Sequence, residues 1–111
     1  MSDYPGEFEQ LVLFALLRLG KDAYGVTVRQ EIAARTKRNV SAGAVYTALE
    51  RMEAKGYVTS RLGDPTPERG GKRKKFYKLE PHGAKALGRA YAAVQAMAEG
   101  LENLKVRKYE S

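Results

Sequence analysis

The sequence contains no cysteine and no tryptophan, and its only histidine is His82. Without cysteine the chain has no disulfide framework, no thiolate nucleophile and no cysteine-ligated zinc or iron–sulfur site. A single histidine leaves one candidate residue for a histidine-rich metal site or for a serine–histidine catalytic pair. We therefore predict that the protein uses no metal and no cofactor.

Long apolar runs are also absent, since the longest spans only residues 11–17. A helix that crosses a membrane needs about 20 apolar residues. Residues 1–9 carry acidic rather than basic charge, which is not the pattern of a secretory signal peptide. These features predict a cytoplasmic protein with no membrane partner.

Positive charge is abundant and concentrated. The 111 residues include 20 Lys and Arg against 13 Asp and Glu, for a net charge of +7 at pH 7. A chain of this length fits one domain, and its charge indicates a polyanionic partner. Most of the excess falls in residues 61–78, whose cations are Arg61, Arg69, Lys72, Arg73, Lys74, Lys75 and Lys78.

Four segments have the apolar spacing of helices, and they cover residues 7–19, 23–36, 42–55 and 81 to about 104. Asp22 is the expected N-cap of the second helix and Ser41 that of the third. Val40, between them, is expected in a short β-bridge.

Residues 57–62 and 74–79 are rich in Tyr, Val, Thr and Phe and predict an antiparallel hairpin. The prolines and glycines of residues 63–73 predict an irregular tip between the strands. The resulting fold is mainly α with a small β-hairpin. Its element order is that of a winged helix-turn-helix (residues 1–80) followed by a C-terminal dimerisation helix and tail (residues 81–111), together one compact unit.

Two helices carry more apolar surface than a small monomer covers. The first is apolar on nearly every face, and the last has an a/d heptad register over almost three heptads. We predict a homodimer; the alternative is that the last helix folds back on its own chain. The predicted interface residues are Phe8, Leu11, Phe14, Leu87, Tyr91, Val94, Met97, Ala98 and Leu101.

The third helix is predicted to enter the major groove of double-stranded DNA with the face that lies opposite its core stripe. Small residues at its start let free N–H groups approach phosphate, Thr47 can contact a base edge, and Arg51 can reach phosphate or guanine. Tyr46 can donate its hydroxyl to phosphate, with a half-buried packing role as the alternative. The predicted DNA-binding residues are Ser41, Ala42, Gly43, Tyr46, Thr47 and Arg51 on the helix, and Arg69, Lys72, Arg73, Lys74 and Lys75 on the hairpin.

Four stretches together resemble the PadR family of bacterial transcriptional regulators. Residues 11–17 are similar to its hydrophobic first helix, and Ala23-Tyr-Gly25 resembles its "GY" entry to the second helix with the order inverted. Gly43-Ala-Val-Tyr-Thr-Ala-Leu-Glu-Arg-Met-Glu-Ala-Lys-Gly-Tyr-Val58 matches "GxxYxxLxxLxxxGxI". Lys74-Lys-Phe-Tyr-Lys-Leu-Glu-Pro-His-Gly83 resembles "RKYYxLTxxG".

The resemblance implies a repressor of the short subclass, in which the first and last helices build the dimer. It implies a DNA role for Tyr46 and for the hairpin cations. Glu80 stands where the family usually has a threonine cap, and the hairpin tip is long. Because the chain has no tryptophan, an aromatic effector clamp of the kind found in some short members is not implied.

Catalysis, effector binding and RNA binding are the alternatives to a DNA-binding function. Catalysis is rejected, because His82 has no partner fixed by spacing and Gly70-Gly-Lys72 is followed by Arg73 rather than Ser or Thr. A small-molecule effector between the subunits stays open, against a dry interface core. Double-stranded RNA is the remaining rival, and a groove-entering helix favours DNA.

Overall fold

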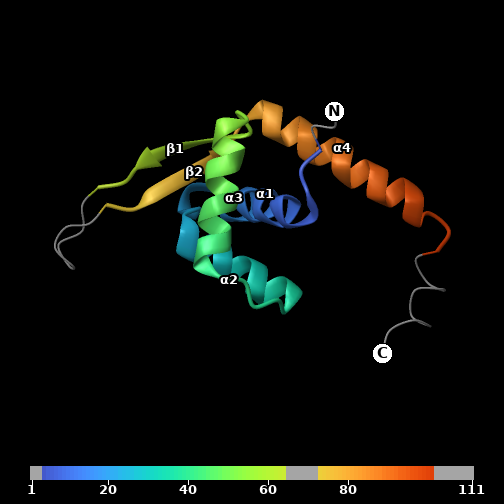
Figure 1. Ribbon diagram of the computed structural model, residues 1–111, viewed down its shortest axis with the longest axis horizontal. Coiled ribbons are helices and arrows are strands. Elements are labelled where there is room, and N and C mark those ends of the chain that lie inside the picture. Colours follow the sequence, from blue (N-terminus) through green and yellow to red (C-terminus); the bar gives the residue numbers. More distant parts are fainter. Residues whose placement is uncertain (1–3, 65–72, 102–111) are drawn as a thin grey trace.

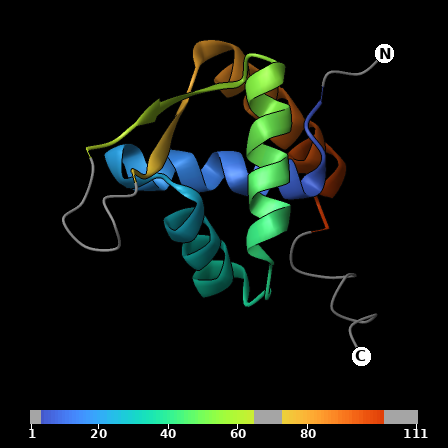
Figure 2. The same cartoon turned by 60° about the vertical axis from the view of Figure 1, so that its left-hand side comes forward.

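A computed structural model describes residues 4–64 and 73–101 (Figures 1 and 2). The elements are α1 (Glu7–Leu19), the short 3-10 helix η1 (Gly20–Asp22), α2 (Gly25–Thr36), α3 (Ala42–Ala54), β1 (Val58–Leu62), β2 (Lys75–Leu79) and α4 (Pro81–Ala98). The predicted fold class and element order are confirmed. No helix in the described ranges has the length and apolar character needed to cross a membrane.

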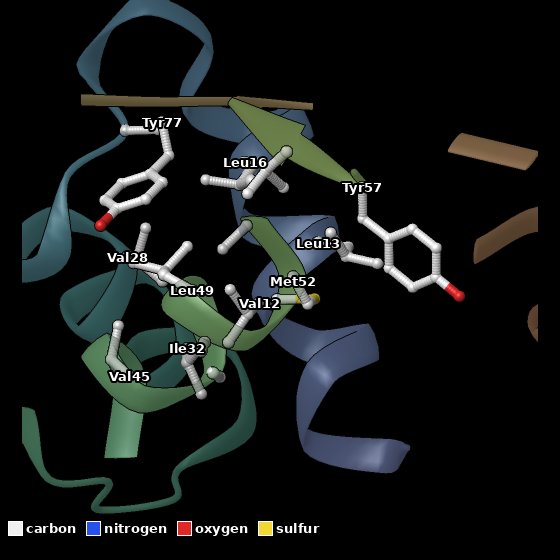
Figure 3. Packing of buried hydrophobic residues seen from close by; sticks show 14 of the residues in the cluster. Val12, Leu13, Leu16, Val28, Ile32, Val45, Leu49, Met52, Tyr57 and Tyr77 are labelled. Atoms are coloured by element: carbon white, nitrogen blue, oxygen red, sulfur yellow. The ribbon is translucent and has the colours of Figure 1, made fainter. Parts of the chain in front are cut away.

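The core lies where α1, α2 and α3 meet, and α3 crosses over α1 (Figure 2). A fully buried Val, Leu or Met stabilises the fold by about 1.5–3 kcal/mol, so these side chains fix the angle between α2 and α3. The buried residues labelled in Figure 3 are Val12, Leu13, Leu16, Val28, Ile32, Val45, Leu49, Met52, Tyr57 and Tyr77.

The hairpin is anchored to the helices through β2. β1 and β2 pair antiparallel, with Ser60 opposite Tyr77. On its other edge β2 meets the segment before α2, because Tyr24 bridges Phe76 and the N–H of Tyr77 donates to the carbonyl of Ala23 at 2.8 Å. β1 is therefore the outer strand, and β2 carries the hairpin's attachment to the start of α2.

The expected bridge at Val40 is wrong, because the bridge outside the named strands lies at Tyr24. The Val40 carbonyl instead accepts a hydrogen bond from Arg29 Nε at 2.9 Å. The expected Asp22 cap is also wrong: α2 begins at Gly25 with Tyr24 as N-cap, and the Thr27 hydroxyl accepts from the Tyr24 N–H at 3.0 Å. α2 begins at Gly25 rather than at the predicted residue 23, because the residues before it are extended against β2.

The last helix has a buried half and an exposed half. Gly83, Ala86, Leu87 and Ala90 are buried against the core, whereas residues 91–97 are exposed and lead away from the other helices (Figure 1). Leu87, predicted at the dimer interface, is only 4% exposed within a single chain, so it belongs to that chain's own core.

The predicted extension of the last helix to about Leu104 is not found in the described residues. The helix ends at Ala98, and Gly100 has φ +85°, a left-handed conformation that stops an α-helix. Leu101 therefore follows the helix rather than continuing the heptad register, and residues 102–104 lie outside the described ranges.

Candidate nucleic-acid interface

The N-terminus of α3 is open to a partner. Ser41 is the N-cap, as predicted, and its Oγ accepts from the Ala44 N–H at 3.0 Å. Ala42 and Gly43 are exposed, and a Cβ added at Gly43 would have no atom within 4 Å. The first N–H groups of an α-helix have no intrahelical acceptor, so this turn can receive a phosphate oxygen at close range.

Tyr46 packs on the start of α2 while part of it stays exposed. The residue is 42% exposed, yet its ring lies directly over Gly25, the first residue of α2. A Cβ added at Gly25 would sit 2.3 Å from the Tyr46 Cζ atom, so only glycine leaves room for the ring. Thr47, one residue further along α3, is exposed without such packing.

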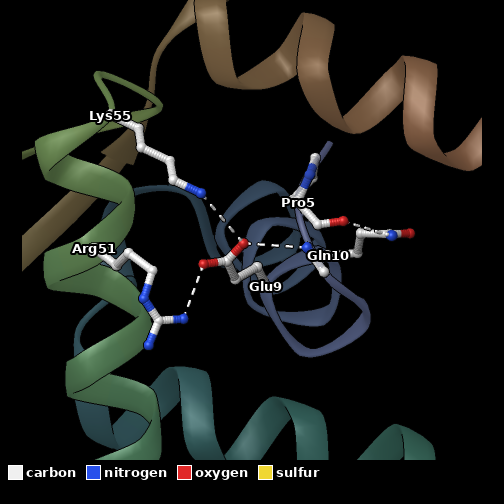
Figure 4. A network of polar contacts seen from close by, with 6 residues as sticks. Pro5, Glu9, Gln10, Arg51 and Lys55 are labelled. Carbon is white, nitrogen blue, oxygen red and sulfur yellow. Dashed lines mark hydrogen bonds and ion pairs between the residues drawn. The ribbon is translucent and has the colours of Figure 1, made fainter. Parts of the chain in front are cut away.

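Arg51 is held by an ion pair with α1, a contact that the sequence did not predict. Its Nη1 donates to Glu9 Oε2 at 3.1 Å, and Lys55 Nζ lies 3.9 Å from Glu9 Oε1 (Figure 4). Glu9 is only 7% exposed and also accepts from the Gly6 N–H at 3.1 Å. Arg51 thus fixes α3 on α1, which limits its reach toward a base.

A spacing signal for Glu9 was present in the sequence. It lies three and four residues before Val12 and Leu13, on the side of α1 that faces the core. An acidic residue on that stripe needs a cationic partner when it is buried, and α3 supplies two.

Arg73, Lys74 and Lys75, the described hairpin cations among the predicted DNA-binding residues, are exposed and each has an intramolecular contact. Arg73 Nε donates to the Gly63 carbonyl at 2.7 Å, and Lys74 Nζ lies 4.7 Å from the centre of the Tyr24 ring. Lys75 Nζ lies 4.0 Å from the Glu53 carboxylate on α3. Arg69 and Lys72 lie outside the described residues.

Glu53 also connects α3 to β1, because the Ser60 hydroxyl donates to its carboxylate at 2.7 Å. Beneath these contacts burial raises the pKa of the Tyr77 hydroxyl above its usual 10, against the opposing effect of the nearby Lys75 charge. Tyr77 is therefore neutral at pH 7 and packs as a core residue. The helix and the hairpin are thus one connected surface.

Alternating rings and cations form a second connection near the tip end of the paired strands. The Arg61 guanidinium lies 4.7 Å from the centre of the Phe76 ring, and Phe76 meets Tyr24 edge to face at 5.2 Å. Lys74 lies on the Tyr24 ring, as given above. The sequence shows that Lys74 and Phe76 are two residues apart at the start of β2, but the position of Tyr24 beside them required the fold.

In the described part of the chain, no three His, Cys, Asp or Glu side chains gather as metal ligands. His82 is exposed at the start of α4, with its ring 5.1 Å from that of Tyr57.

The remaining predicted interface residues fall on one exposed apolar surface. Phe8, Leu11 and Phe14 on α1 are half-buried, and Tyr91 of α4 meets Phe14 edge to face at 5.5 Å. The rest of the stripe continues along α4, with Val94 58% exposed, Met97 81% exposed and Ala98 half-buried.

Comparison with known proteins gives consistent matches. An uncharacterized protein from Lysinibacillus sphaericus is 32% identical over 88 residues, which cover 78% of this chain and 72% of that protein. A PadR family transcription regulator from hypervirulent Clostridium difficile R20291 has TM-score 0.68 at 21% identity, covering 86% of this chain and 95% of its own.

The PcaV transcriptional regulator from Streptomyces coelicolor, in complex with its natural ligand, has TM-score 0.68 at 17% identity and covers 96% of this chain and 68% of its own. These structural likenesses support the winged-helix fold. At the level of sequence, residues 13–89 match the transcriptional regulator PadR-like family. The chain therefore belongs to the PadR-like family and is a DNA-binding regulator of transcription.

Proposed function

We propose that the protein is a repressor that binds a pseudo-palindromic operator as a homodimer. The first turn of α3 approaches the floor of the major groove, and the hairpin cations contact flanking phosphates. The observation that carries this proposal is the open, small-residue start of α3, together with the exposed Arg73 and Lys74 of the hairpin.

The shape of the site favours DNA over RNA. A single exposed helix with alanine and glycine in its first turn suits the major groove of B-form DNA, which is about 12 Å wide. The major groove of an A-form duplex is deep and narrow and excludes such a helix. Competition between DNA and RNA duplexes of one sequence tests this preference.

Dimerisation is supported by the exposed half of α4. Tyr91, Val94 and Met97 form an apolar stripe that continues across Phe14 onto α1. A small hollow of about 90 Å³ between α1 and α2, lined partly by Phe14, extends this surface. A second copy that covers the stripe would set two α3 helices against successive major grooves, about 34 Å apart.

The salt dependence of binding tests the hairpin's role. Replacing Arg73 and Lys74 with alanine removes two phosphate contacts, so the slope of log K against log salt should become shallower by about 1.8, at about 0.9 per contact. The matched control replaces Lys85 and Arg89, two exposed cations on α4, and should leave the slope unchanged. Equal slopes in all three proteins would place the hairpin away from phosphate.

A ligand-responsive form of the same regulator is the second candidate. PcaV, which shares the fold, was crystallised with its natural ligand, and the apolar stripe of α4 offers a surface for an effector between two copies. Thermal unfolding against a panel of phenolic acids and planar cations tests it. The absence of any shift across the panel would argue for a dry interface.

A further inference from the structure

The two faces of the hairpin have different surroundings. Ser60 and Tyr77 share the face toward α3, since Tyr77 is buried and Ser60 donates to a carboxylate on that helix. Side chains alternate between faces along a strand. Arg61, Phe76 and Lys78 therefore occupy the opposite face, directed away from α3.

A hollow of about 630 Å³ lies between this hairpin and the end of α1 with η1. Leu16, Phe76 and Leu79 supply apolar lining. The volume falls within the range of about 300–1,000 Å³ that is usual for small-molecule sites. It can hold a one- or two-ring compound.

The charge of the hollow has one sign. Lys21, Arg61 and Lys78 line it, and among its lining residues, all of which are described, none is acidic. Arg61 lies against the Phe76 ring at 4.7 Å, so one wall offers a cation next to an aromatic face. The Glu80 carboxylate does not line the hollow and accepts a hydrogen bond from the hydroxyl of Thr59, a lining residue, at 2.7 Å.

We propose that this hollow binds a small organic anion with an apolar ring. The ring packs on Leu16, Phe76 and Leu79, and the carboxylate or phosphate accepts charge-assisted hydrogen bonds from Lys21 and Lys78. An inorganic anion would leave the apolar wall uncovered, and a neutral ring would leave the cations without a partner. The site goes beyond the proposed function, because it takes a small molecule and needs neither a duplex nor a second copy of the chain.

Titration of the full chain with 2-naphthoate, followed by calorimetry in the absence of DNA, tests the site. Replacing Lys21 and Lys78 with alanine should weaken binding at least tenfold. The control pair Lys85→Ala and Arg89→Ala, which removes the same charge from α4, should change binding by less than twofold. The neutral 2-naphthamide and inorganic phosphate should each bind at least tenfold more weakly than naphthoate.

Three outcomes would overturn the proposal: no naphthoate binding at millimolar concentration, equal binding of the amide, or equal weakening by the control pair. A variant with Lys21→Arg and Lys78→Arg keeps the charge and should retain binding, which separates loss of the site from loss of the fold. If duplex DNA alone depends on Lys21 and Lys78, these cations belong to the DNA surface. Because the titration contains no DNA, its failure leaves the proposed DNA-binding function untouched.

Discussion

At the scale of single residues, Glu9 shows how a buried charge positions a binding helix. Its carboxylate accepts from the Gly6 N–H and pairs with Arg51 and Lys55, so one side chain joins the start of α1 to α3. A buried carboxylate is costly unless it is paired and hydrogen-bonded, and these three partners satisfy both requirements.

Glu9→Ala should lower the free energy of unfolding by about 1–2 kcal/mol. This is less than the 3–5 kcal/mol typical of breaking a fully buried pair, because Arg51 is half exposed and can be hydrated. Glu7→Ala is the control, since Glu7 lies in the same turn and pairs with Arg38 at the surface; it should cost about 0.5 kcal/mol or less. Urea unfolding measures both, and equal losses would mean that burial of Glu9 contributes nothing.

Thr47 is the residue of α3 best placed to read a base. It is exposed, whereas Tyr46 packs on Gly25 and Arg51 pairs with Glu9. Thr47→Ala should therefore reduce preference for a selected operator over random DNA by about 1 kcal/mol, roughly fivefold. Binding to random duplexes should hardly change. Equal losses on both duplexes would remove Thr47 from sequence readout.

At the scale of elements, the hydrophobic pattern predicted the four α-helices and both strands, and the errors fell where contacts between distant segments decide the structure. Tyr24 carries no sequence signal of its strand bridge, because the bridge exists only once β2 lies beside it. That pairing delays α2 and displaces the cap from Asp22. A glycine in the interior of a helix weakens it, but only the φ of +85° at Gly100 shows that the last helix stops before this residue.

The junction between the hairpin and α4 depends on close backbone approach. A Cβ added at Gly83 would lie 2.2 Å from the Tyr57 carbonyl oxygen, and that carbonyl also accepts from the Glu80 N–H at 2.9 Å. Backbone atoms held by a hydrogen bond cannot move aside as a flexible side chain does, so no larger residue fits without shifting α4.

Gly83→Ala should consequently lower stability by about 1–3 kcal/mol, the usual cost of overpacking. Gly88→Ala on the same helix is the matched control, because a Cβ there would meet no atom within 4 Å. That change should stabilise the protein by about 0.5–1 kcal/mol through higher helix propensity. Thermal unfolding compares the two, and a Gly83→Ala variant as stable as Gly88→Ala would show that the close approach of Gly83 to Tyr57 costs nothing.

For the whole molecule, the sequence located the charged surface but not its internal contacts. The basic stretch of residues 61–78 follows from composition alone, and Ser41 was recognised as the cap of α3. Composition does not reveal that Lys75 faces Glu53 or that Lys74 lies on Tyr24, since both contacts join segments far apart in the chain. The first contact orients the hairpin relative to α3 and the second relative to the start of α2, and the proposed binding of one duplex by both elements depends on this arrangement.

The apolar stripe of α4 is the feature on which the proposed assembly rests. Val94 and Met97 are among the most exposed large apolar side chains in the described part of the chain, and exposed apolar stripes of this kind mark association surfaces. Val94→Asp together with Met97→Asp should place two carboxylates in that surface and yield monomers in sedimentation.

Ala92→Asp with Ala96→Asp adds the same charge to the opposite side of α4, where both alanines are exposed, and this control should remain dimeric. The monomeric variant should still bind a single half-site but lose the gain in affinity from a second half-site, because that gain requires two α3 helices held by one assembly. If the Val94 and Met97 variant instead sediments as a dimer, the copies must meet elsewhere and the spacing of about 34 Å between their α3 helices loses its basis.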